Sequence, residues 1–448
     1  MNRKNDVLLE VERKYRKRHW IGIVVAVFVL LAGLGTFLQV THILLPKAPP
    51  NSEPGISSAE KKTIETSSST SSTETALSSI PTEFAVSTEA TLSSDDLATV
   101  LLKGMTLEEK ICQVFLVQPE ALGGNAVFFD ESSQAALELY PVGGIILFSD
   151  NLETREQCME MIQDYQKASK VPLFIGVDEE GGYVSRLGSD PDMGVPHFPP
   201  MQEIGTTMDQ DAAYNVGYTL GEELAALGFN LDFAPVADVN TNPDNPVIGS
   251  RAFSTDAKVA ADMVRACVSG FRDAGMISCI KHFPGHGDTQ TDTHLGNAET
   301  GKTLYDMGQE EFLPFKAGIS AGAPTVMVGH ISCPNITGDQ VPASLSFKLI
   351  TNVLRRDLGF DGVVITDAMN MGAIAESYPS GEAAVLALEA GCDIVLIPEN
   401  LQEATAAIRS ALASGRLTEE RLNESVLRIL RLKLEYDIIP QVEASGIG

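Results

Sequence analysis

The chain of 448 residues is long enough to form one large hydrophobic core or two smaller ones. Its 44% hydrophobic and 21% charged residues are typical of a globular protein and exclude a wholly disordered chain. The 32 Lys and Arg residues against 60 Asp and Glu residues leave a net charge of -28, which argues against nucleic acid as a partner because phosphates need a basic surface. Six scattered cysteines, without a CxxC pair, indicate buried thiols rather than a disulfide framework or a zinc site.

The N-terminal segment is predicted to anchor the chain in a membrane. Residues 1–19 carry seven basic and three acidic groups, and residues 20–38 contain no charge and no proline. As a helix, this apolar run spans about 28 Å, close to the ~30 Å core of a bilayer, and no signal-peptide cleavage site follows it. A buried core helix is the alternative, which apolar residues on all faces disfavour. Because the basic cluster precedes the run, we expect a cytoplasmic N-terminus, a single-pass anchor over residues 20–45 and an extracellular remainder.

Residues 46–93 differ abruptly in composition from the segments on either side. Thr66 to Thr73 is a run of eight consecutive Ser or Thr residues, with prolines and isolated glutamates around it. Such a segment cannot bury enough apolar surface to offset its chain entropy. We therefore expect a flexible linker here, followed by the folded domain over residues 94–448.

The folded domain is predicted to be a (β/α)8 barrel of the TIM type. Short β-branched runs alternate with longer amphipathic stretches, several of which end in glycine, as helices commonly do. Eight such units over about 350 residues match an eight-stranded parallel barrel. A doubly wound open sheet is the alternative, but no GxGxxG turn follows the first strand. The predicted strands are Cys112–Val117, Gly143–Phe148, Leu173–Asp178, Asn230–Pro235, Ser278–His282, Val326–His330, Val363–Asp367 and Asp393–Ile397.

Polar residues end several of these apolar strands. In a parallel barrel, the carboxyl ends of the strands meet at one face, where the chemistry takes place. A single Asp at such a position can simply cap the next helix. Five polar residues at four strand ends make that interpretation poor, and they predict one site that contains Asp178, Lys281, His282, His330 and Asp367.

The segment from Lys281 to His294 (KHFPGHGDTQTDTH) is dense in ionisable residues. Its His and Asp residues could ligate a metal, although Pro284 and two glycines make it a loop rather than a rigid element. Alternatively, Asp292 could orient His294 and favour its charged form, so that the imidazole donates a proton and later retrieves it. The residues by themselves leave both interpretations open.

Three further segments carry groups suited to gripping and cleaving a polar substrate. Asp367 ends an apolar strand, where a carboxylate can attack an electrophilic carbon. Asp178 and Arg186 flank a glycine pair, and Arg251 follows the fourth strand. With Lys281 and His282, these groups could hold sugar hydroxyls by charge-assisted hydrogen bonds. Surface salt bridges are an equally simple interpretation of the two arginines.

Together, these motifs resemble glycoside hydrolase family 3 and, within it, the β-N-acetylglucosaminidase branch. The resemblance rests on KHFPGHG followed by Asp-Thr-His, on VDEEGG-x-V-x-R and on the run from Val353 to Asn370 (VLRRDLGFDGVVITDAMN). It covers residues 95–436. Two positions depart from the pattern of the family, in which Gln is usual at position 179 and Arg is frequent at position 183. Because we expect Glu179 and Tyr183 beside the sugar site, the preference for the leaving group or linkage is in doubt.

The resemblance implies a retaining hydrolase that removes terminal β-linked N-acetylglucosamine through a covalent glycosyl-aspartate. It implies Asp367 as the nucleophile and Asp292 with His294 as the acid/base dyad. It implies no metal and no organic cofactor, and a set of sugar-binding residues that comprises Asp178, Arg186, Arg251, Lys281 and His282.

The expected substrates are GlcNAc-containing oligosaccharides or muropeptides, and we expect a monomer held at the bacterial cell membrane by its N-terminal helix. A β-glucosidase or xylosidase is one rival, although such enzymes normally carry a second α/β domain after the barrel. A wall-glycan-binding surface protein without catalysis is another rival, and a metal hydrolase is the third.

Overall fold

The computed structural model describes residues 93–293 and 296–440. The predicted anchor over residues 20–45 and the linker over residues 46–93, apart from Ser93, lie outside the described residues, so both stay predictions. Within the described ranges, no helix combines the length and the apolar character needed to cross a bilayer.

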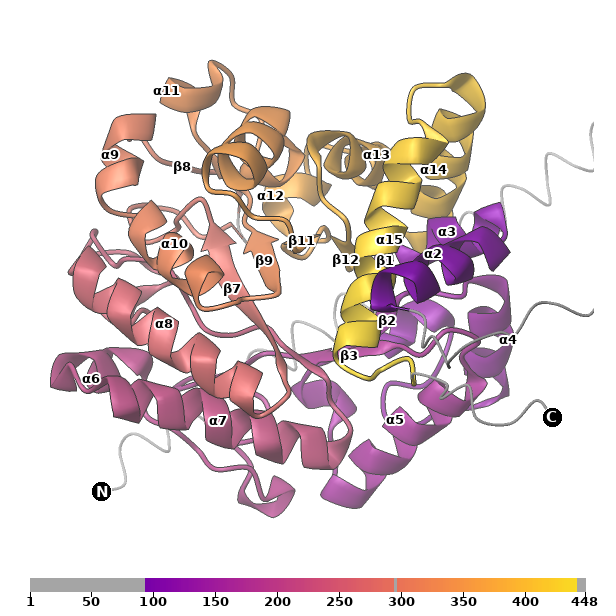
Figure 1. Ribbon diagram of the computed structural model, residues 1–448, viewed down its shortest axis with the longest axis horizontal. Helices are drawn as coiled ribbons and strands as arrows, with labels where there is room; N and C mark the ends of the chain where they lie inside the picture. Colours follow the sequence, from indigo (N-terminus) through magenta and orange to yellow (C-terminus); the bar gives the residue numbers. More distant parts are fainter. Residues whose placement is uncertain (1–92, 294–295, 441–448) are drawn as a thin grey trace, which may run out of the picture. The chain divides into compact units, whose positions relative to one another are not determined.

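Eight parallel strands form a nearly closed barrel, as predicted (Figure 1). Their order around the sheet is β11, β9, β7, β6, β3, β2, β1 and β12. A parallel bridge between Ile365 and Ile394 joins the two end strands, so the sheet is not the open, doubly wound alternative. The strands are β1 (Phe115–Val117), β2 (Gly144–Leu147), β3 (Phe174–Val177), β6 (Leu231–Asp232), β7 (Ile277–Phe283), β9 (Thr325–Val328), β11 (Val363–Thr366) and β12 (Val395–Leu396).

Helices follow the strands and cover the outside of the barrel, so the strands are apolar on both faces (Figure 1). Inside it, Gly176 of β3 makes room for Phe233, whose ring would lie 2.8 Å from a Cβ at that position. The main helices of the outer layer are α4 (Glu131–Leu139), α5 (Arg155–Ala168), α7 (Gln210–Leu227), α8 (Ala257–Asp273), α10 (Phe312–Ser320), the segment Lys348–Asp357, α13 (Ser380–Ala390) and α14 (Leu401–Ser414).

The first predicted strand was placed too early. Cys112 and Gln113 belong to helix α3 (Leu107–Gln113), and the strand begins only at Phe115. The helix starts with a capping box, in which Thr106 and Glu109 satisfy each other's backbone N–H groups. This local signal outweighs the β-branched character of the run that follows.

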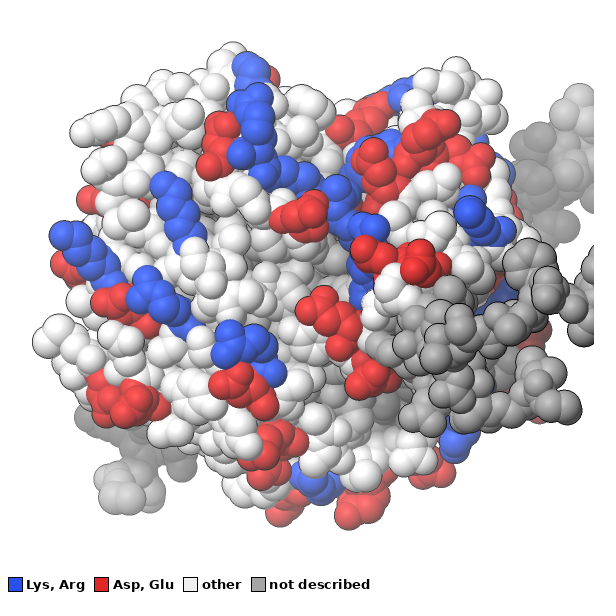
Figure 2. All heavy atoms as spheres, viewed as in Figure 1, with Lys and Arg blue, Asp and Glu red and all other residues white. Residues whose placement is uncertain are grey.

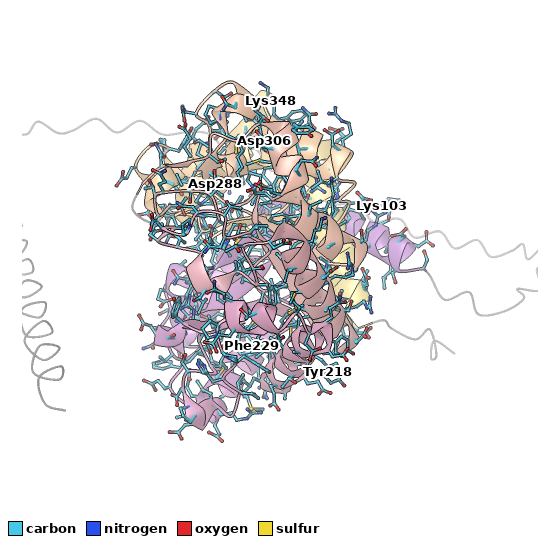
Figure 3. All side chains as sticks on the ribbon, turned by 90° about the vertical axis from the view of Figure 1, so that its left-hand side faces the viewer. Lys103, Tyr218, Phe229, Asp288, Asp306 and Lys348 are labelled. Carbon is cyan, nitrogen blue, oxygen red and sulfur yellow. The ribbon has the colours of Figure 1, made fainter. Side chains whose placement is uncertain are left out.

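The two ends of the barrel are built differently. Helices α2 (Ser94–Gly104), α3 and α15 (Glu419–Glu435) pack together beside the amino ends of the strands, which we call the floor. The long loops after β3, β6 and β7 lie at the carboxyl ends, which we call the mouth. Figure 3 shows Asp288 of the loop after β7 and Lys103 of α2 on opposite sides of the molecule. In the face that Figure 2 shows, Lys and Arg side chains lie close to Asp and Glu side chains. Ion pairs of this kind include those of Arg416 with Glu382 and Glu389.

Candidate active site

A pocket of about 160 Å³ lies at the mouth of the barrel. Its wall combines apolar residues from the strand ends with charged residues from the loops, which is the composition of a site for a polar ligand. The structure thus brings together six of the eight residues that are predicted to bind or cleave the sugar: Asp178, Arg186, Arg251, Lys281, His282 and Asp367.

The seventh and eighth predicted residues belong to the loop after β7. Asp292 is described but does not line the pocket, whereas its neighbour Thr293 does. His294 lies outside the described residues. The pairing of Asp292 with His294 therefore stays a prediction.

Glu180, which was not among the predicted site residues, is the centre of the charged wall. It is buried and accepts two hydrogen bonds from Arg251, at 2.8 Å from Nε and 2.7 Å from Nη2. Lys281 Nζ lies 2.6 Å from the same carboxylate. Burial opposes the charge of Glu180, but Arg251 and Lys281 outweigh it and hold the pKa of this carboxyl well below its usual range. This arrangement keeps both cations charged and fixed in the wall.

Asp178 connects this charged set to the pocket. It follows β3 and accepts a hydrogen bond from Lys281 Nζ at 2.6 Å, while Arg186 Nη2 lies 3.6 Å from its other oxygen. Arg186 also stacks over the ring of Phe148, 5.5 Å from the centroid. Burial works against the charge of Lys281, yet Asp178 and Glu180 raise the pKa of this amine above its usual value. The two arginines are thus not simple surface salt bridges, because both line the pocket.

A buried carboxylate, Asp238, organises His282 of β7 and His286 of the loop that follows this strand. Its Oδ2 lies 2.7 Å from Nδ1 of His282 and also accepts the His282 backbone N–H, at 3.2 Å. Its Oδ1 accepts the His286 backbone N–H at 2.7 Å. Burial opposes the charge of Asp238, but the His282 ring and these hydrogen bonds lower the pKa of the carboxyl. Asp238 therefore orients His282 toward the pocket, a role that no sequence motif indicated.

Hydrogen bonds also decide the role of His286. The hydroxyl of Thr289 donates to the His286 carbonyl oxygen at 3.0 Å, so it accepts from Nδ1–H at 2.7 Å. Nε2 is then left to accept from the hydroxyl of Thr293, at 3.2 Å. Burial lowers the pKa of His286, which favours this neutral form. The ring thereby holds Thr293, the residue after Asp292, against the pocket wall.

Asp367 reaches the pocket from the end of β11. Its backbone N–H donates to Val328 O at 2.8 Å, and its Oδ1 accepts from Ala368 N at 2.8 Å. His330 supports this turn from below, since its Nε2 lies 2.9 Å from Ala368 O and its Nδ1 lies 2.8 Å from the Ser344 hydroxyl. His330, which was predicted to be part of the site, does not line the pocket and is instead a buried support of the Asp367 turn.

Of the two positions that depart from the family pattern, Glu179 does not lie where we expected it, beside the sugar site. Glu179 does not line the pocket: its carboxylate contacts Ser185 Oγ and accepts Leu187 N at 2.8 Å, behind the β4–β5 hairpin. The hairpin comprises β4 (Glu179–Gly181) and β5 (Val184–Ser185). Because successive residues of a strand point to opposite faces, Glu180 faces the cations and Glu179 faces away. Tyr183, at the turn, is largely exposed.

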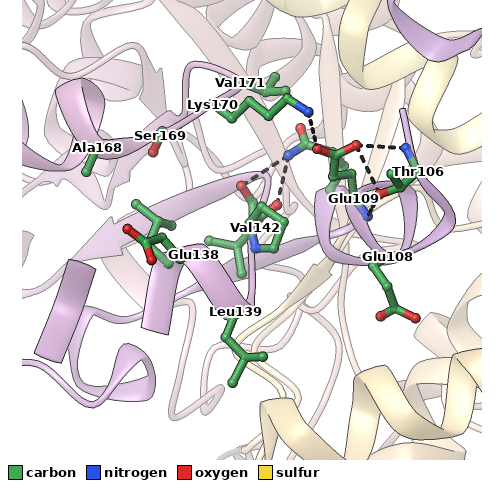
Figure 4. A pocket seen from close by; sticks show the side chains of 13 residues that line it. Thr106, Glu108, Glu109, Glu138, Leu139, Val142, Ala168, Ser169, Lys170 and Val171 are labelled. Carbon is green, nitrogen blue, oxygen red and sulfur yellow. Dashed lines mark hydrogen bonds and ion pairs between the residues drawn. The ribbon is translucent and has the colours of Figure 1, made fainter. Parts of the chain in front are cut away.

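A larger cavity of about 360 Å³ lies near the amino ends of β2 and β3 (Figure 4). The polar groups in its wall are paired with each other: Glu109 accepts Thr106 N and contacts Lys170, and Gln113 Nε2 donates to the carbonyls of Pro141 and Val142. We place the active site in the smaller pocket because only there do charged groups from several strand ends converge. Within residues 93–293 and 296–440, no group of three His, Cys, Asp or Glu side chains could hold a metal ion.

Comparison with known proteins agrees with this geometry. The profile of the glycosyl hydrolase family 3 N-terminal domain matches residues 106–432. The chain is 35% identical to "Beta-hexosaminidase A" of Pseudoalteromonas piscicida over 334 residues, which are 68% of this chain and 55% of that protein. It is also 35% identical to a "Beta-hexosaminidase" of Nitrosomonas eutropha, over 71% of this chain and 93% of that protein.

A solved structure gives the same result. The family 3 β-N-acetylglucosaminidase from Paenibacillus sp. is 37% identical and superposes with a TM-score of 0.71, over 75% of this chain and 63% of that chain. The present chain thus spans between about half and nearly all of the length of these relatives. Barrel, mouth pocket and sequence similarity together show that the chain belongs to glycosyl hydrolase family 3.

Proposed function

We propose that the protein is a retaining β-N-acetylhexosaminidase that removes terminal β-linked GlcNAc from cell-wall-derived glycans. The observation that carries the proposal is the convergence of Asp367 with a fixed set of charged donors and acceptors in one pocket at the mouth. The similarity to β-hexosaminidases supports the choice of sugar. A β-glucosidase or a non-catalytic wall-glycan-binding protein is the alternative.

In this proposal, Asp367 attacks the anomeric carbon while His294 protonates the oxygen of the leaving group. This step breaks the glycosidic bond and links the sugar to the carboxylate of Asp367 in the α configuration, because the attack inverts the anomeric carbon. Water, deprotonated by His294, then attacks the same carbon and releases the sugar with a second inversion, so that the configuration is retained. Asp292 orients the imidazole of His294 and favours its charged form.

The sugar is held by the charged wall. Asp178 accepts hydrogen bonds from sugar hydroxyls, whereas Arg186, Arg251, Lys281 and His282 donate them. Because Glu180 and Asp238 already hold Arg251, Lys281 and His282, these donors lose little side-chain entropy when the sugar binds. The scheme uses only groups of the chain and water.

A mechanism-based inactivator tests this assignment. A 5-fluoro-N-acetylglucosaminyl fluoride should add the mass of one fluorosugar to the peptide that contains Asp367, and proton NMR should show β-configured product as the first product. A label on another residue, or inversion at the anomeric carbon, contradicts the proposal. A wild-type enzyme that fails to cleave any chromogenic GlcNAc glycoside favours the non-catalytic alternative.

The natural substrate requires a separate experiment. We propose peptidoglycan fragments, and digested peptidoglycan should release free GlcNAc when the protein is added. The same digestion with added phosphate would release GlcNAc 1-phosphate if phosphate, rather than water, were the preferred acceptor.

For its place in the cell, we propose a catalytic domain outside the membrane, held by the apolar run at residues 20–38. The support is the basic cluster that precedes this run. Protease added to intact cells should cut the Ser/Thr-rich linker and release active enzyme. Activity that stays protected until the cells are lysed contradicts this topology.

A further inference from the structure

Tyr183 lies at the rim of the mouth pocket without lining it. The residue is at the turn of the β4–β5 hairpin, directly before Val184, which is part of the pocket wall. Its hydroxyl accepts a hydrogen bond from Ser250 Oγ at 3.0 Å, and Ser250 precedes Arg251, another residue of the wall. The ring thus connects two segments that both border the pocket.

The turn that carries Tyr183 is held firmly. Gly182 has a φ of +61°, which favours glycine, and a Cβ at this position would lie 3.0 Å from Pro200 Cα. The Gly182 backbone N–H also donates to Phe198 O at 3.0 Å. With its backbone and its hydroxyl both held, the ring can bind a ligand at a small cost in conformational entropy.

The ring is nevertheless 72% exposed. Single exposed aromatic residues are common, and Tyr305 of α9 (Leu304–Gln309) is exposed to a similar extent, at 75%. Among the described residues with large exposed apolar side chains, however, Tyr183 alone is next in sequence to a residue of the pocket wall. Its exposed ring therefore borders the pocket wall at two places, at Val184 and, through Ser250, at Arg251.

We propose that Tyr183 is the binding subsite for the leaving group of the substrate, where its ring stacks on the second sugar. This inference rests on the proposed function. At about 160 Å³, the pocket is smaller than the ~300 Å³ at which ligand sites usually begin, so we expect it to hold no more than one sugar, with the next one outside it. A β-linked pyranose presents C–H groups on its faces, which an aromatic ring attracts. The preferred substrate class is thus an oligosaccharide in which GlcNAc is β-linked to another pyranose.

Two substrates with the same first sugar test the subsite. N,N′-diacetylchitobiose has a pyranose as its leaving group, whereas methyl β-N-acetylglucosaminide has only a methoxy group. With the full chain, Tyr183→Ala should lower kcat/KM for the disaccharide about 3- to 10-fold and leave the methyl glycoside within about twofold of wild type. Tyr183→Phe keeps the ring and should stay within about twofold on both substrates.

Tyr305→Ala is the matched control, because it removes an equally exposed ring that has no connection to the pocket, and it should change neither substrate. Ser250→Ala keeps the Tyr183 ring and removes the same hydrogen bond as Tyr183→Phe, so it should also stay within about twofold on both substrates. An equal loss on both substrates for Tyr183→Ala, or no loss on the disaccharide, overturns the subsite. If the wild type cleaves neither substrate nor any aryl GlcNAc glycoside, the proposed function itself fails, and the subsite fails with it.

Discussion

The mouth and the floor of the barrel both bury charged side chains, but they arrange them differently. At the mouth, Glu180 is shared between Arg251 and Lys281, and Asp178 extends the set to the pocket. At the floor, a buried ionisable group either pairs with other charged groups or has only uncharged hydrogen-bond partners. The comparison teaches that burial of charge does not by itself mark an active site. The mouth differs from the floor because its charged side chains line a cavity.

Two groups illustrate the closed arrangement of the floor. Asp393 is fully buried before β12 and accepts hydrogen bonds from Arg355 at 2.6 Å, Arg428 at 3.2 Å and the Ser425 hydroxyl at 2.8 Å. Lys433 of α15 is also fully buried, and its amine donates to Gly143 O at 2.9 Å and Gln113 Oε1 at 3.1 Å. Because the hydrogen-bond partners of Lys433 carry no charge, burial lowers the pKa of this amine to about 7.

The largest effect is expected for Asp367→Asn. The variant should lose at least about 10³-fold in kcat on p-nitrophenyl β-GlcNAc, because a neutral amide cannot replace the nucleophile, while the free energy of unfolding in urea should change little. Asp361→Asn is the control at the opposite end of the same strand, where the side chain is exposed, and it should keep full activity. If Asp367→Asn keeps more than a tenth of the activity, the mouth pocket is not the catalytic site.

At the floor, Asp393→Asn should reduce stability rather than activity. It leaves three arginines without their buried carboxylate and should lower the free energy of unfolding by about 3 kcal/mol. Urea denaturation measures this loss, and kcat of the folded variant should equal that of the wild type. If kcat fell while the free energy of unfolding stayed the same, Asp393 would act in catalysis rather than in stability.

Glu180→Gln should lower kcat/KM by about 10- to 100-fold, since Arg251 and Lys281 lose the charge that fixes them in the pocket wall. Steady-state kinetics with p-nitrophenyl β-GlcNAc measures the change. The matched control is Glu179→Gln, because its side chain lies behind the hairpin, and this variant should stay within about twofold of wild type. Equal losses in both variants would show that the hairpin as a whole, rather than its charge, determines activity.

For Lys433→Met, we expect a change in the pH dependence of stability rather than in activity. The pKa of Lys433 is about 7 in the folded state and about 10.4 when unfolded, so within this window the unfolded state binds the additional proton. Wild-type stability therefore falls as pH decreases from about 10 to 7, by no more than about 1.4 kcal/mol per pH unit from this group. The variant lacks this contribution, so the difference in unfolding free energy between wild type and variant should shift with pH in that window.

Urea denaturation of both proteins at several pH values between 7 and 10 measures this difference, in which the other titrating groups cancel. Lys167→Met, at an exposed position, should show no such shift. A pH-independent difference for Lys433→Met would mean that the amine stays charged inside the floor.

The sequence by itself determined the strands and the residues that end them. Strand runs that are apolar on both faces predicted the barrel, and Asp178, Lys281, His282 and Asp367 were found because a strand end is recognisable along the chain. Arg186 and Arg251, predicted from the loops after the third and fourth strands, also line the pocket. These features depend on local order in the sequence, which is why they could be predicted.

Only the tertiary structure decided which side chains face each other. In the run of three acidic residues from Asp178 to Glu180, the hairpin turns Glu180 toward Arg251 and Glu179 toward Ser185, and nothing in the order of the residues indicates that register. Asp238 likewise gains its role only because the loop after β6 lies beside the end of β7, where His282 is 44 residues further along the chain. Contacts between distant segments depend on packing, and packing is set by the whole barrel rather than by any one motif.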